Sequence, residues 1–186
     1  MRKIFSEVEL ESLRGLIGSA FQFVAGPGLW HALTGSSVYV VCDNSPIGVQ
    51  AYSDEEEFQG EWEDFSRLQL IPVTKKEVEE CVQDGFAYRK HMGELVRGVL
   101  VIVDEIFGEL DGVKNLDYLS HSGIVLQFDT GYICIAKHDH HQPVIKVTYL
   151  DDMSEEQMPH TFNRFDEDLN QKFYLKRTLL DLSANG

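Results

Sequence analysis

Three histidines and one aspartate occupy consecutive positions in the stretch AKHDHHQP at residues 136–143 of the chain. On an extended strand, His138 and His140 point to the same face, which is the arrangement of an H-x-H metal-binding pair. Such a pair needs further ligands from elsewhere in the chain. The candidates are His121, His160 and Asp129. This pattern predicts a divalent-metal site in an enzyme or a metal sensor.

The same stretch also fits a polar loop between two strands, ended by Pro143. No further acidic ligand follows closely, because the next residues read QPVIKV. A short metal-binding motif has little weight without its structural context. We therefore favour the loop and keep the metal site as the alternative.

The densest acidic and aromatic stretch of the chain lies around EEEFQGEWED. It is either a solvated loop or a docking surface, since exposed aromatic side chains among acids suit a basic partner. The candidate partner-binding residues are Glu55, Glu56, Glu57, Phe58 and Trp62.

Two aspartates, Asp43 and Asp129, occupy equivalent positions in two similar stretches of sequence. Paired carboxylates can carry out acid–base chemistry, but an aspartate at a turn more often bonds to nearby backbone. We expect the structural role. The chain contains no GxSxG nucleophile elbow, Walker A loop or GxGxxG turn, so we expect a protein without catalytic residues and without a cofactor.

The chain is strongly acidic, with 31 Asp and Glu against 16 Lys and Arg and a formal net charge of −15 over 186 residues. A field of this sign disfavours nucleic acid and anionic membranes as partners, and it attracts a basic protein. The charge by itself indicates solubility first and a basic protein partner second.

The three cysteines, Cys42, Cys81 and Cys134, show no CxxC spacing, which is typical of a reducing compartment. The N-terminus has no apolar segment typical of a signal peptide, and the longest apolar run, VLVIV at 99–103, is too short to cross a bilayer. We therefore expect a cytoplasmic protein.

An internal repeat organises the chain. An offset of 86 residues places residues 33–54 on residues 119–140 without a gap, so that Leu33 falls on Leu119. Both stretches alternate apolar and polar residues and break at a short polar turn. This pattern predicts a β-hairpin in each stretch.

The flanks of the two hairpins predict matching elements. Helical spacing of apolar residues precedes each hairpin, a further strand follows it, and a capping box then starts another helix. The expected helices span about 10–24, 95–110 and 162–180, the further strands are 67–73 and 143–150, and the capping boxes are Thr74 with Glu77 and Ser154 with Gln157.

The sequence therefore predicts an α+β fold made of an α-β-β-β-α unit that occurs twice, at about 1–92 and 93–186. A three-stranded sheet with one polar face is marginal alone, so the two units should share a core. We expect one compact domain with pseudo-twofold symmetry, in which antiparallel sheets pack against helices.

The hairpin GIVLQFDTGYICI at 123–135 resembles hairpins of small bacterial immunity and toxin-system proteins. This resemblance implies no site residue. Together with the charge and the acidic stretch, it suggests a non-enzymatic binding protein, such as an immunity-type inhibitor of a basic toxin. The alternatives are a metal-dependent enzyme or sensor using His138 and His140, and a small-molecule-binding module with a cleft between the repeats.

Overall fold

The fold is seen in a computed structural model, which describes residues 2–27, 29, 34–43, 45–58, 61–84, 87–138, 142–154 and 171–183. These residues form mostly antiparallel β-sheet, with two helices, α1 (Glu7–Arg14) and α2 (Lys75–Gln83). The strands form two separate sheets.

The first sheet has five strands in the order β6-β5-β4-β2-β7. Its strands are β2 (Phe21–Ala25), β4 (Ser37–Cys42), β5 (Ser45–Phe58), β6 (Glu61–Ile71) and β7 (Ala87–Tyr88). Neighbouring strands pair antiparallel, and β5 and β6 form one long two-stranded hairpin.

The second sheet has seven strands, of which six follow the order β12-β8-β9-β10-β11-β3, while β1 pairs in parallel with β9. Its strands are β1 (Arg2–Lys3), β3 (Thr34–Gly35), β8 (Gly98–Leu110), β9 (Val113–Phe128), β10 (Gly131–Lys137), β11 (Ile145–Leu150) and β12 (Gln171–Asp181). The last strand, β12, returns to pair with β8 along its whole length.

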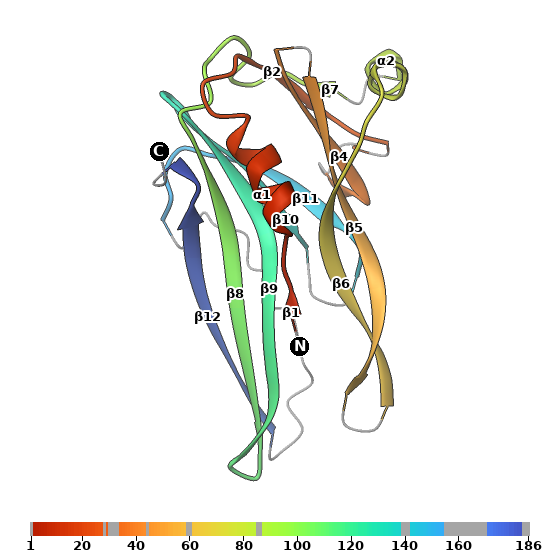
Figure 1. Ribbon diagram of the computed structural model, residues 1–186, viewed down its shortest axis with the longest axis vertical. Coiled ribbons are helices and arrows are strands. Elements are labelled where there is room, and N and C mark those ends of the chain that lie inside the picture. The colour runs from red at the N-terminus through yellow and green to blue at the C-terminus, as the bar shows by residue number, and fades with distance from the viewer. Residues whose placement is uncertain are drawn as a thin grey trace.

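The main core lies between the two sheets, with α1 packed at one side of the gap (Figure 1). Each sheet contributes buried aliphatic side chains, and α1 adds two leucines. The core includes Val24, Val40 and Val49 from the first sheet, Val99, Leu126 and Ile135 from the second, and Leu10 and Leu13 from α1. Each such side chain stabilises the fold by about 1.5–3 kcal/mol relative to its exposure in water.

Both predicted hairpins are confirmed. In the first, Val40 of β4 faces Ile47 of β5, and in the second, Leu126 of β9 faces Ile133 of β10. The same offset of 86 residues relates the two registers, because both hairpins close through a two-residue turn.

The two sheets also share a strand order. In each, four strands follow one another as a meander, β2-β4-β5-β6 in the first sheet and β8-β9-β10-β11 in the second. A fifth strand, β7 or β12, then pairs with the first strand of the meander. The division of the chain into repeats at 1–92 and 93–186 stays a prediction.

The predicted α+β class is wrong, since the described residues form a β-rich fold with only two helices. The expected helix at 95–110 is instead strand β8. Its apolar run is buried on both faces: Val99 and Val101 face the core between the sheets, while Leu100 and Ile102 belong to a second apolar cluster. A strand buried on both faces reads as a continuous apolar run and loses the alternation that marks a half-buried strand.

The expected helix at 10–24 is confirmed only as far as Arg14, and the expected helix at 162–180 is wrong where the structure describes it. The N-terminal helix ends at Arg14, and Gly18 then adopts a φ of +85° in a turn that leads into strand β2. In the C-terminal segment, residues 171–181 form strand β12, whereas residues 162–170 lie outside the described part of the chain. In the C-terminal segment, apolar residues three or four positions apart have the spacing typical of a helix, although residues 171–181 lie in a strand at the edge of a sheet.

The capping box of Thr74 and Glu77 is confirmed. The Thr74 side chain accepts a hydrogen bond from the Glu77 backbone N–H, and the Glu77 carboxylate accepts one from the Thr74 N–H, which starts α2. Of the second predicted box, Ser154 is described but Gln157 lies outside the described residues.

The pairing of β12 with β8 yields a stability prediction. Nε and Nη2 of Arg177 donate to the two carboxylate oxygens of the fully buried Asp104 at 2.7 and 2.8 Å. Arg177→Met should lower the free energy of unfolding by about 3–5 kcal/mol, because a buried carboxylate would lose its bidentate cation. Urea denaturation measures the change.

The adjacent Lys176 provides the matched control, since its ion pair with Glu105 joins the same two strands at the surface. Lys176→Met should change the free energy of unfolding by less than about 1 kcal/mol. Equal effects of the two substitutions would contradict a special role for the buried pair.

Candidate functional site

The acidic stretch of the sequence belongs to the distal parts of the paired strands β5 and β6, which lie at the lower right of Figure 1. The stretch expected to be a loop is thus a regular ladder. In its register Glu55 faces Asp64, Glu56 faces Glu63, and Glu57 faces Trp62. Two acidic pairs therefore lie directly opposite each other.

The proximal half of this hairpin is anchored to the body of the protein. Phe65 and Leu68 are buried, and the ring of Phe65 packs against Tyr118 of β9 at a centroid distance of 5.4 Å. Asp54 forms an ion pair at 2.7 Å with the buried amine of Lys3. The hairpin is therefore held against the second sheet up to Asp54.

Beyond Asp54, two acids of strand β5 stand apart from the ion pairs that the described residues form. Glu55 and Glu57 are exposed and form no ion pair with any residue of the described part of the chain. Acids elsewhere in the sheets have cationic partners, such as Asp117 with Lys114 and Asp129 with Arg97. Like charges directly opposite in a ladder are unfavourable in the absence of a counter-charge. A cationic partner would supply this counter-charge.

Of the five predicted partner-binding residues, the structure places Glu55 and Glu57 at the surface. The backbones of Glu56, Phe58 and Trp62 lie in the same two strands, in register with one another as described. Their side chains lie outside what the structure describes.

The histidine stretch begins where β10 ends. His138 is exposed, and its backbone N–H donates to the carbonyl of Val144 at 2.8 Å. Asp139, His140 and His141 lie outside the described residues. The metal-binding pair of His138 and His140 thus stays a prediction. The offset of 86 residues places the histidine stretch on Tyr52–Glu57, which is part of strand β5 and not a loop.

Two of the three candidate further ligands of the metal site form hydrogen bonds with other groups of the protein. Nδ1 of the buried His121 accepts a hydrogen bond from the backbone N–H of Phe5 at 2.9 Å. Asp129 binds Arg97 through both carboxylate oxygens, and His160 lies outside the described residues. In the part of the chain that the structure describes, no group of three His, Cys, Asp or Glu side chains could hold a metal ion.

Asp43 and Asp129 each join a turn to a neighbouring segment of the chain. Asp43, at a φ of +45°, accepts a hydrogen bond from the Ala20 N–H at 3.0 Å through its carboxylate. Asp129 is held by Arg97, which keeps the pKa of that carboxyl below its usual range. Both therefore have structural partners, as expected for turn residues.

A buried polar cluster that the sequence did not reveal joins the two sheets. Nζ of the fully buried Lys137 donates to the Ser120 hydroxyl at 2.8 Å and to the Ser66 carbonyl at 3.0 Å. A serine and a lysine at this distance could form a catalytic dyad. Ser120 is also fully buried, so a substrate could not reach it. The cluster thus connects β10 and β9 to β6.

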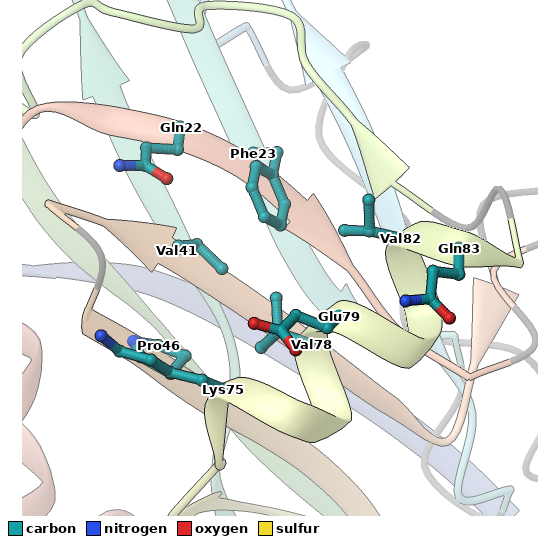
Figure 2. A pocket seen from close by; sticks show the side chains of 9 residues that line it. All are labelled: Gln22, Phe23, Val41, Pro46, Lys75, Val78, Glu79, Val82 and Gln83. Carbon is teal, nitrogen blue, oxygen red and sulfur yellow. The ribbon is translucent and has the colours of Figure 1, made fainter.

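The structure also contains a groove of about 450 Å³ between α2 and the outer face of the first sheet (Figure 2). In Figure 2, α2 runs beside Phe23 of β2 and Val41 of β4, with Lys75 and Gln83 near its two ends. The groove is lined by Gln22, Phe23, Val41, Pro46, Lys75, Val78, Glu79, Val82 and Gln83. The small-molecule alternative therefore has a cavity on one sheet, away from the space between the two.

Known proteins do not guide the choice among these features. Neither a protein-family model, nor a curated protein, nor a solved structure matches the chain. Among the described residues, no helix is long and apolar enough to span a lipid bilayer.

The buried His121 yields a pH prediction. Burial lowers the pKa of His121 from 6.5 to about 4. As the pH falls below 6.5, the unfolded chain takes up this proton first, so the free energy of unfolding should fall between pH 6.5 and about 4. His121→Gln should flatten the stability profile in this window, because glutamine can accept the Phe5 hydrogen bond without titrating.

The exposed His138→Gln substitution is the control for this measurement, since its side chain lies at the surface. Denaturant unfolding at half-unit pH steps gives the three profiles. A His121→Gln profile that parallels the wild type would show that this histidine does not control the acid response.

Proposed function

We propose that the protein is a non-enzymatic binding protein that recognises a basic macromolecular partner through the distal half of the β5–β6 hairpin. The observation that carries this proposal is the register of the hairpin, in which Glu55 faces Asp64 and Glu56 faces Glu63. Such a ladder is destabilised by itself and becomes favourable when lysine or arginine side chains lie between the acids.

The surroundings of the hairpin support the same assignment. The chain carries a formal net charge of −15, so a basic protein is attracted from a distance and then oriented by local charge. Phe58 and Trp62 belong to the same segment of the ladder, and aromatic residues are frequent anchors of protein interfaces. The ladder thus combines long-range steering with residues that suit a buried contact.

An immunity-type inhibitor of a basic toxin is one concrete form of this function. The inhibitor would cover a cationic surface of the toxin with the acidic hairpin. The proposal places the protein in the cytoplasm, which agrees with three cysteines that are buried and free.

The two alternative functions differ from this proposal in where they would act. A metal-dependent enzyme or sensor would use His138 and His140, and metal analysis of the purified protein would identify it. A small-molecule-binding protein would use the groove under α2, whose volume falls within the range of about 300–1,000 Å³ typical of ligand sites.

Neutralising the hairpin tests the proposed function. A fluorescently labelled peptide of alternating lysine and serine residues serves as the basic probe, and fluorescence anisotropy measures its dissociation constant at low salt. The double variant Glu55→Gln/Glu57→Gln should bind the peptide about fivefold more weakly, because two exposed charges leave the site. The wild-type affinity should also fall as salt rises.

The other long hairpin supplies a matched control of equal charge. Glu109 and Asp111 lie at the end of the β8–β9 hairpin, and Glu109→Gln/Asp111→Asn removes the same number of negative charges there. This variant should keep wild-type affinity. Equal weakening by both double variants would mean that net charge alone binds the peptide, which contradicts a site on the β5–β6 hairpin.

A further inference from the structure

Strand β12 stands at the end of the second sheet, where it has β8 as its one neighbour in the strand order of the described residues. It is 11 residues long, from Gln171 to Asp181. Its large apolar side chains are unusually exposed: Tyr174 by 49%, Leu175 by 37%, Leu179 by 42% and Leu180 by 39%. Long, apolar sheet edges readily accept another strand.

The direction of the backbone groups of β12 follows from one hydrogen bond. The N–H of Leu182 donates to the carbonyl of Val99 at 3.0 Å, in continuation of the β12–β8 register. Alternate residues of an antiparallel strand bond to the same neighbour. The even-numbered residues thus bond to β8, while Leu175, Arg177 and Leu179 direct their N–H and C=O groups away from it.

Exposed edges are usually protected by charged side chains that repel a second strand. The two cations at the centre of β12 are instead neutralised by β8. Lys176 forms an ion pair with Glu105, and Arg177 forms the bidentate pair with the buried Asp104. The centre of this edge therefore carries little net charge.

The apolar residues of β12 are arranged symmetrically about Arg177. Leu175 and Leu179 lie two residues to either side of it, and Tyr174 and Leu180 lie three residues to either side. In an antiparallel pair of identical strands centred on Arg177, Leu175 would face Leu179 of the other strand, and Tyr174 would face Leu180. Every exposed apolar residue would meet another one.

We propose that β12 pairs antiparallel with β12 of a second copy of this chain, about a twofold axis at Arg177. The pairing would join two seven-stranded sheets edge to edge and would bury four apolar cross-strand contacts, two on each face. Arg177 directs its backbone groups outward, so the central pair can exchange both hydrogen bonds with its symmetry mate. Other twofold registers place leucine opposite a charged residue or beyond the end of the strand.

Cysteine cross-linking tests this register directly. In the proposed dimer the Cα atoms of Leu175 and the second copy's Leu179 would lie about 5.5 Å apart, which suits a disulfide bond. Mild oxidation of the double variant Leu175→Cys/Leu179→Cys should therefore convert most of the protein to a covalent dimer on a non-reducing gel. The three native cysteines are buried, and burial raises the pKa of the Cys42 and Cys134 thiols to about 12, so they should stay unreacted.

The two single variants are the matched controls. Each introduced cysteine would lie about four residues, or roughly 13 Å, from its own symmetry mate, which is too far for a disulfide. Leu175→Cys and Leu179→Cys should therefore stay monomeric on the gel. Covalent dimers of either single variant at the rate of the double variant would overturn the proposed register.

Sedimentation equilibrium tests the association without any cross-link. The wild-type chain should show a concentration-dependent dimer, and Leu179→Lys should be a monomer because it places a charge against Leu175 of the second copy. Val113→Lys, at a position 69% exposed in the β8–β9 hairpin, should dimerise like the wild type. A wild-type chain that stays monomeric at every concentration would overturn the proposal.

Discussion

The apolar layer shared by the two sheets is the feature on which the rest of the structure depends. Neither sheet could bury its inner face alone, and the layer combines residues such as Val40 and Ile135 from different sheets with Leu13 of α1. Because these side chains come from both halves of the chain, the sheets must fold together. This shared layer then determines where the long hairpins emerge.

Buried polar groups join the two sheets near this layer, whereas two surfaces distant from it are unbalanced in opposite ways. Lys137 and Lys3 are buried with polar partners, and both help to hold β6 or β5 against the second sheet. The distal β5–β6 hairpin carries excess negative charge, while the β12 edge carries exposed leucines around neutralised cations. Charge suits a basic partner, and an apolar edge suits a strand of its own kind.

The parts of the fold that could be predicted are those governed by neighbouring residues. Both hairpins and the start of α2 depend on alternation, two-residue turns and a capping box, which are local. Strand β8 was mistaken for a helix because its burial on both faces hides the alternation. For the candidate site, the acidic residues were visible in the sequence, but their opposition across a ladder required the register. The groove under α2 could not be predicted, since its walls come from separate elements.

The sequence by itself determined the local elements with a two-residue period, the acidic character of the chain and the residues of the acidic segment. Only the tertiary structure decided that Glu55 faces Asp64, that Arg177 neutralises Asp104, and that Leu175 and Leu179 lie on the last strand in the order of the described residues. The physical reason is the distance along the chain. Turn and capping interactions join residues a few positions apart, whereas Arg177 and Asp104 are 73 residues apart and meet only when β12 pairs with β8.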